Sequence, residues 1–368
     1  MRWLRGALLV PLAIVLAGAL GWAGLALWFD GPAARPLAGA LAAGVVVGVL
    51  ALLILVRPMR RALGAVLVLW LVVLGWWLRI PPRADRDWQP DVARVATADI
   101  HGDVVTIHNV RDFDYRSETD FTERWEDRTY DLSHLQGADL FLSFWGPTLI
   151  AHTILSWEFD DGKPLAISIE TRKERGEEYS ALRGFFRQYE LYYVVADERD
   201  VVRLRTNYRG ERVFLYRLRG SPALARRLLV SYLDQINRLA RTPQWYNALT
   251  QNCTTTIRFH AQQAAVRNPL DWRLFANGRG DELLYERGDI DTSLPLAALR
   301  TRSDITAKAR AADQDGRFSD LIREGIPSRP PPARASGWRE RVRHASARRA
   351  AYRASTNGSA HDKGGHHQ

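Results

Sequence analysis

The hydrophobic pattern separates an apolar amino-terminal part of the chain from a longer part of mixed character. Three runs without a charged residue, 6–28, 36–56 and 62–78, contain mostly Leu, Val, Ala, Gly and Trp. At 1.5 Å per residue the first two are long enough to cross about 30 Å of hydrocarbon, and the third is at the lower limit of that length. We therefore interpret residues 1–80 as a transmembrane region of three helices. Cleavage of the first run as a signal peptide is the competing interpretation.

Basic residues in the short loops predict the orientation of these helices, because Lys and Arg favour the cytoplasmic side. Arg2 and Arg5 precede the first run, and three more arginines, within 57–61, join the second run to the third. The amino terminus is then inside and everything after residue 80 is outside. This predicts a multi-pass protein of a bacterial inner membrane with its carboxy-terminal domain in the periplasm. Indole rings favour the headgroup level, so four tryptophans are expected near the outer interface: Trp28, Trp76, Trp77 and Trp88.

The pattern after residue 80 predicts three further regions. Residues 81–98 form a proline-containing linker, residues 99–325 an α+β domain, and residues 326–368 a disordered basic tail with too little apolar surface to fold. A helix is expected over 221–240, where Ser221 caps and Pro222 occupies the first turn. Short runs rich in branched and aromatic residues predict a mainly antiparallel sheet. These runs are 104–110, 139–145, 149–159, 164–171, 190–196 and 212–218.

The charge distribution and the cysteine count exclude several kinds of partner and site. The net charge of +10 belongs to the ends: residues 1–90 hold nine basic and three acidic residues, and residues 326–368 hold nine and two. Residues 91–325 contain 33 basic and 36 acidic residues, a net charge of −3, so we expect no nucleic-acid partner. The single cysteine excludes an intramolecular disulfide and a cysteine-built zinc site. Neither metal-ligand spacing nor a glycine-rich phosphate loop is evident, and no cofactor is predicted.

The single cysteine, Cys253, lies where an extended segment gives way to a predicted helix. Asn252 before it is a good N-cap. A thiol in the first helical turn faces the positive end of the helix dipole and unpaired N–H groups, which favour the thiolate. Cys253 is therefore a candidate nucleophile, and the same N–H groups are candidate donors to an oxyanion. The alternative is a small buried hydrophobic residue.

A thiol nucleophile usually needs a histidine base. His152 lies in the predicted strand 149–159, on a face that alternation makes partly polar. The following hairpin decides its partner. A three-residue turn with Gly162 in the left-handed conformation puts Glu170 opposite His152, whereas a two-residue turn puts Thr171 there. We favour the three-residue turn, and with it Glu170 as the group that orients the imidazole. His260 lies two helical turns beyond Cys253, too far for direct proton transfer.

Several spaced motifs resemble one bacterial family. They are Phe144-Trp145-Gly146, His152-Thr153-Ile154-Leu155-Ser156, Ser168-Ile169-Glu170-Thr171-Arg172, the run 190–200, Tyr246-Asn247 and Asn252-Cys253-Thr254-Thr255. Over residues 105–275 the chain resembles DUF4105, also called the Lnb N-terminal periplasmic domain after a lipoprotein N-acyltransferase. The resemblance implies a circularly permuted thiol enzyme of the papain and NlpC/P60 type, with histidine before cysteine. It also implies a catalytic Cys253 and His152. The namesake carries its membrane helices after this domain, whereas here they precede it.

These observations predict a membrane-anchored, outward-facing thiol acyltransferase or hydrolase. Cys253, His152 and Glu170 are the expected catalytic residues, and membrane lipids and lipoproteins are the expected partners. One alternative keeps the thiol chemistry and takes a cell-wall peptide as substrate, as NlpC/P60 enzymes do. Another is a non-catalytic membrane scaffold in which Cys253 is buried packing.

Overall fold

The structure is a computed structural model that describes residues 2–146, 148–264, 271–274 and 277–332. The chain divides into two compact units, which we describe separately. The membrane unit comprises residues 1–87, 171–191 and 243–248. The sheet unit comprises residues 88–170, 192–242 and the chain from 249 onward.

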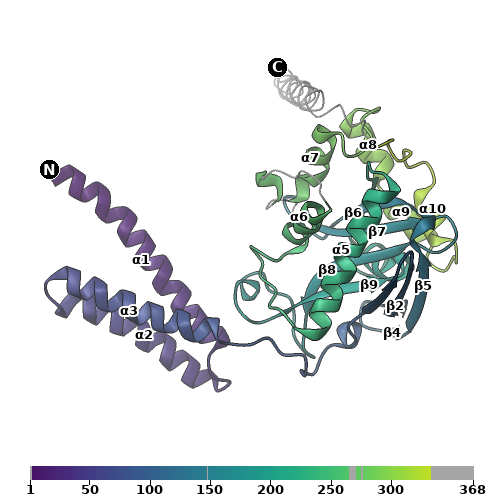
Figure 1. The fold of residues 1–368 in the computed structure, drawn as a ribbon. Helices are drawn as coiled ribbons and strands as arrows, with labels where there is room; N and C mark the ends of the chain where they lie inside the picture. Colours follow the sequence, from purple (N-terminus) through teal and green to yellow (C-terminus); the bar gives the residue numbers. More distant parts are fainter. Residues whose placement is uncertain (1, 147, 265–270, 275–276, 333–368) are drawn as a thin grey trace, which may run out of the picture. The chain divides into compact units, whose positions relative to one another are not determined.

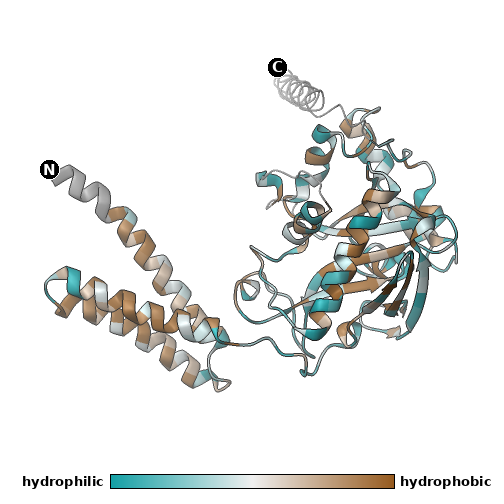
Figure 2. Cartoon of the chain, viewed as in Figure 1, coloured by the Kyte–Doolittle hydropathy of each residue, from teal (hydrophilic) through white to brown (hydrophobic). Residues whose placement is uncertain are grey.

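Three helices dominate the membrane unit: α1 (Arg2–Asp30), α2 (Arg35–Leu55) and α3 (Met59–Leu78). Each contains a span of 20 or 21 residues that is long and apolar enough to cross a membrane. Most residues that Figure 2 colours on these helices are apolar, as expected of helices that face lipid. The helices confirm the three predicted apolar elements, and aromatic contacts of Trp22 with Trp70 and Trp77 join α1 to α3.

A mixed, mostly antiparallel sheet is the centre of the sheet unit (Figure 1). Within the described residues it has eight strands in the order β1-β2-β9-β8-β7-β6-β10, with β5 paired to β2. The strands are β1 (Thr97–His101), β2 (Val104–Arg111), β5 (Trp125–Asp131), β6 (Leu135–Phe144), β7 (His152–Phe159), β8 (Leu165–Arg172), β9 (Glu190–Ala196) and β10 (Arg212–Arg217). A separate two-stranded sheet joins β3 (Asp114–Tyr115) to β4 (Phe121–Thr122). The α+β class and the mainly antiparallel sheet are confirmed.

Helices cover both faces of this sheet. The predicted helix α5 (Pro222–Arg241) lies against one face, where Trp157 donates its indole N–H to the carbonyl of Ala225. The other face packs on α4 (Glu198–Arg203), α9 (Thr306–Ala311) and α10 (Phe318–Arg323). Helices α7 (Gly280–Arg287) and α8 (Leu296–Ser303) follow α6 (Cys253–Gln263) along the chain. The polar face expected on the His152 strand is therefore largely buried, with its polar groups paired inside: Ser156 donates to Glu198 at 2.5 Å.

The domain begins earlier than the sequence pattern suggests. Strand β1 starts at Thr97, and Trp88 and Val92 are buried in the hydrophobic core of the sheet unit. The expectation that Trp88 lies at the membrane interface is wrong, because its indole is only 7% exposed among core side chains. The proline-containing stretch 81–98 is thus only partly a linker.

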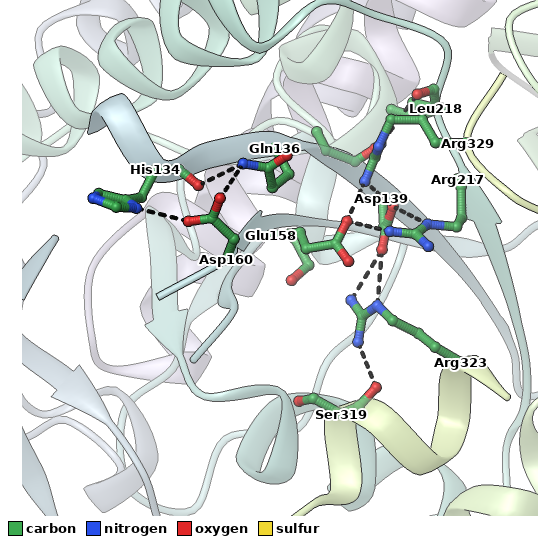
Figure 3. A network of polar contacts seen from close by, with 12 residues as sticks. His134, Gln136, Asp139, Glu158, Asp160, Arg217, Leu218, Ser319, Arg323 and Arg329 are labelled. Carbon is green, nitrogen blue, oxygen red and sulfur yellow. Dashed lines mark hydrogen bonds and ion pairs between the residues drawn. The ribbon is translucent and has the colours of Figure 1, made fainter. Parts of the chain in front are cut away.

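The first residues of the predicted tail are bound to the sheet unit. Arg329 donates to Asp139 and to Glu158, each at 2.8 Å (Figure 3). Gly137 leaves room for this arrangement, since a Cβ at that position would overlap the guanidinium of Arg329. Asp139 is fully buried and also pairs with Arg323 of α10. Residues 333–368 of the predicted tail lie outside the described residues.

Candidate functional site

Cys253 is the first residue of α6 (Cys253–Gln263). Asn252 caps the helix as predicted: its Oδ1 accepts from the N–H of Thr255 at 2.9 Å, and its own N–H donates to Thr255 Oγ1 at 3.1 Å. This reciprocal capping box fixes where the helix begins. The half-buried thiol therefore lies in the first turn, where the helix dipole favours negative charge.

Asn277 connects this thiol to the start of the histidine strand. Its Nδ2 lies 3.8 Å from Cys253 Sγ and 2.7 Å from Thr254 Oγ1. The same amide pairs with both backbone groups of Ala151, accepting from its N–H at 2.9 Å and donating to its C=O at 2.6 Å. The Nδ2 distances to the sulfur and to this carbonyl oxygen, 3.8 Å and 2.6 Å, together limit their separation to about 6.4 Å.

His152 follows Ala151 directly and is the first residue of β7. The observed register pairs Ile154 with Ser168, and its continuation puts Glu170 opposite His152, as predicted. The left-handed conformation expected of Gly162 is wrong, because its φ is not positive, and β7 ends at Phe159 while β8 begins only at Leu165. The Nε2 of His152 lies 3.6 Å from Glu170 Oε1. The structure thus brings the predicted histidine and carboxylate together.

Ser168 stands between these two groups and defines the tautomer of the imidazole. Its Oγ donates to Glu170 at 2.8 Å and lies 2.6 Å from His152 Nε2. A serine hydroxyl has one proton, and because that proton is given to the carboxylate, Nε2–H must donate to Ser168. Nδ1 then carries the lone pair and is free to accept a proton. Within the described part of the chain, no side chain bonds to Nδ1, and the polar contacts of Cys253 Sγ are Thr254 and Asn277.

A buried arginine completes this network. Arg205 lies in a π-helical turn, Leu204–Tyr208, and donates to Glu170 at 2.9 Å and to Glu211 at 3.1 Å. Burial, reinforced by the positive charge of Arg205, lowers the pKa of His152 to about 3. Burial alone would raise the pKa of Glu170, but the attraction of Arg205 outweighs it and lowers that pKa. At neutral pH the site therefore holds a neutral imidazole and an ionised carboxylate.

Another histidine of the described residues, His260, has structural surroundings. His260 is fully buried on α6, between the hydroxyls of Tyr193 and Ser231, each at 2.8 Å. Burial lowers its pKa to about 3, so it is a neutral packing group.

One group in the described residues could offer ligand atoms to a metal. His134, Asp160 and Asp161 bring theirs within 4.8 Å of one another. All three are exposed, and the His134 ring already bonds to Asp160 at 2.7 Å (Figure 3). An open, self-satisfied cluster of this kind is ordinary surface pairing.

The sequence pattern missed three residues of this site. Ser168 shares a strand face with Glu170, so alternation could have found it. Arg205 lies 35 residues from the carboxylate that it binds. Asn277 contacts Ala151 across 126 residues. No local periodicity reports contacts of such separation.

Comparison with known proteins agrees with the motifs. Residues 121–278 match the family described as the Lnb N-terminal periplasmic domain. The matched range includes Cys253, His152, Glu170 and Asn277. Searches of curated proteins and of solved structures found no match. Three apolar helices of membrane-crossing length before such a domain indicate membrane anchoring. Over residues 121–278, therefore, the chain is similar to the Lnb N-terminal periplasmic domain.

Proposed function

We propose that the protein is a membrane-anchored thiol acyltransferase or hydrolase that acts through Cys253 and His152 on acyl groups of lipids or lipoproteins. One observation carries the proposal. A thiol in a capped first helical turn is joined through Asn277 to the residue before a histidine whose Nδ1 is free. The order of histidine before cysteine also supports a circularly permuted papain-like arrangement, which forms part of the proposal.

The chemistry follows from these groups. His152 Nδ1 takes the Sγ proton as the sulfur attacks an ester carbonyl, and N–H groups of the first turn of α6 donate to the oxyanion. The C–O bond breaks, the alkoxide takes the proton from His152, and the acyl group remains on Cys253 as a thioester. An amine that attacks this thioester gives an amide, whereas water gives a free acid, and the thiol is restored in both cases.

The low pKa of His152 defines the order of these events. An imidazolium is disfavoured beside Arg205, so a standing thiolate–imidazolium pair is disfavoured too. The proton therefore moves as the sulfur attacks an electrophile, and the imidazole and the thiol come into hydrogen-bond distance during that attack. Catalytic hydrogen bonds are often longer before substrate binds. Ser168 and Glu170 would keep Nδ1 aimed as a base throughout.

Exposed apolar side chains near the site favour an acyl substrate over a cell-wall peptide. Leu149 and Ile150, at 54% and 53% exposed, immediately precede the Ala151–His152 pair, and Trp272 is 52% exposed. The backbone of Leu149 accepts from Gly278, the residue after Asn277, at 3.0 Å. Solvent-exposed apolar groups of this size mark contact with apolar partners. An acyl chain would cover them, whereas a polar muropeptide would leave them in water.

The location completes the proposal. Three spans are an odd number, so the chain after α3 lies on the opposite side of the membrane from the amino terminus. With Arg57, Arg60 and Arg61 on the cytoplasmic side, the sheet unit is outside the inner membrane of a bacterium. That side holds the acylated lipoproteins that a thiol of this kind would serve.

The test is the acylation state of lipoprotein amino termini in cells that express the full chain or its variants, read by mass spectrometry. Cys253→Ala and His152→Ala should both lose the chain-dependent acylation. His134→Ala, which removes an exposed histidine away from the site, is the matched control and should retain it. Unchanged acylation with Cys253→Ala, at equal protein level, would refute the proposed substrate.

A further inference from the structure

A segment of the chain far from the helices in sequence binds the ends of α1 and α3 within the membrane unit. Asp30, the last residue of α1, accepts a hydrogen bond from the indole of Trp77 on α3 at 2.7 Å. The same carboxylate accepts from the side chain of Gln188 at 2.6 Å and from the backbone N–H of Arg187 at 3.2 Å. One acidic residue thus joins two membrane helices to residues 187–188.

Further contacts strengthen this attachment. The Arg187 guanidinium lies 4.5 Å from the ring centroid of Trp77, a cation–π distance, and also donates to the carbonyl of Ile80. Phe186 packs on Phe29 of α1, with ring centroids 5.2 Å apart. Residues 186–188 therefore contact α1, α3 and the residues that follow α3.

The residues just before this attachment expose apolar side chains. Tyr179, Leu182 and Phe185 are 49%, 49% and 43% exposed. The backbone that carries them is ordered by internal bonds: Gly184 N–H donates to the carbonyl of Ser180 at 2.9 Å. The hydroxyl of Tyr189 accepts from the N–H of Ser180 at 3.1 Å. Three apolar side chains are thus held in solvent by a structured turn.

We propose that residues 178–188 are an interfacial membrane element, in which Tyr179, Leu182 and Phe185 insert into the outer leaflet beside α1 and α3. The ends of helices that cross about 30 Å of hydrocarbon lie at the lipid–water interface. Residues 186–188 contact two such helix ends. Phe185 is the residue directly before this attachment, and Leu182 and Tyr179 precede it within seven residues, which places the three side chains close to these helix ends. Aromatic and aliphatic side chains with a polar backbone suit this region.

The bilayer is the occupant that continuity favours. The apolar surface of α1 and α3 faces lipid, and the segment continues this surface because residues 186–188 contact both helices. The proposal is independent of the thiol chemistry, since no residue of the segment belongs to the candidate site. It gives the chain a second attachment to the leaflet, besides its covalent connection through residues 79–87.

Lipid quenching tests the proposal in the full chain reconstituted in phosphatidylglycerol and phosphatidylethanolamine vesicles. A Cys253→Ser background removes the native thiol, and Leu182→Cys then carries an environment-sensitive fluorophore. The control is Val104→Cys, an apolar strand position that is 46% exposed and lies outside the segment. We expect a blue-shifted emission at position 182, quenching by lipids spin-labelled near the headgroup, and loss of quenching by aqueous iodide. Position 104 should show the opposite behaviour.

A second variant separates attachment from folding of the segment. Arg187→Ala removes the guanidinium contacts with Trp77 and Ile80 and leaves the Tyr189 bonds unchanged, so lipid quenching at position 182 should fall while the chain stays folded. Iodide quenching at 182 equal to that at 104 would overturn the proposal. A blue shift without lipid quenching would also overturn it, because a protein surface would then cover the segment.

Discussion

The amide of Asn277 offers the sharpest perturbation of the candidate site. Asn277→Ala removes the partner of two backbone groups of Ala151, a residue that is 1% exposed. A buried polar group left without a partner costs about 1–3 kcal/mol, so the loss of both partners should lower the free energy of unfolding by about 2–6 kcal/mol. Asn277→Asp keeps the shape of the side chain but sets a carboxylate oxygen against the Ala151 carbonyl, where Nδ2 now donates at 2.6 Å. Asn277→Asp should therefore lower the free energy of unfolding at least as much as Asn277→Ala.

The chain contains a matched control for this substitution. Asn237 of α5 makes the same two-bond clamp on Ala98 of β1, accepting at 2.8 Å and donating at 2.7 Å, and it has no contact with the site. Asn237→Ala should therefore cost a similar free energy of unfolding. A comparison of the two variants separates loss of stability from loss of positioning.

The assay uses the only cysteine of the chain. We would measure the rate of iodoacetamide reaction at Cys253, with and without His152→Ala, in wild type, Asn277→Ala and Asn237→Ala. His152 should accelerate the reaction in wild type and in Asn237→Ala, but this dependence should vanish in Asn277→Ala because the two segments are no longer held together. Equal dependence on His152 in all three backgrounds would refute the positioning role.

Three further predictions follow from the buried polar groups. His152 and His260 have folded pKa values of about 3 and unfolded values near 6.5, so the unfolded state binds more protons between these pH values. Stability should thus fall from pH 6.5 towards pH 3, by up to about 4 kcal/mol for each histidine, and calorimetry of His260→Gln should show a shallower decline. Ser168→Ala removes the acceptor of Nε2–H and should slow the His152-dependent alkylation about fivefold, the kinetic equivalent of one hydrogen bond of ~1 kcal/mol. The lost hydrogen bond should also lower the thermal stability, so an unchanged thermal stability would contradict this prediction. Gly137→Ala displaces Arg329 and should cost about 1–2 kcal/mol in urea unfolding, since a buried carboxylate loses one of its cations; adding Arg329→Ala should then cost nothing more.

Local patterns predicted those parts of the fold that local physics determines. Uncharged apolar runs indicated α1 to α3, and branched and aromatic runs indicated β9 over the residues observed. The predicted register brings Glu170 to His152, although Gly162 does not adopt the left-handed conformation from which that register was argued. The capping residue Asn252 located the start of α6 at the thiol.

Long-range contacts decided the rest. Trp88 looked like an interfacial tryptophan because indole rings favour the headgroup level, yet it is buried in the hydrophobic core of the sheet unit. Arg329 looked like part of a disordered tail, yet it neutralises Asp139 inside the sheet unit. Asn277 and Arg205 reach their partners through folded geometry alone. A residue whose role is to pair a distant backbone or carboxylate has no spacing that reveals it.

The most direct test of the account is the chemical state of Cys253 during turnover. Full-length protein in membranes with an acylated lipoprotein as donor would be digested and its Cys253 peptide examined by mass spectrometry. The account predicts a thioester-linked acyl group at this residue, removed by neutral hydroxylamine and absent when His152 is replaced by Ala. A Cys253 peptide that stays unmodified while the donor is consumed, or one acylated equally without His152, would contradict it.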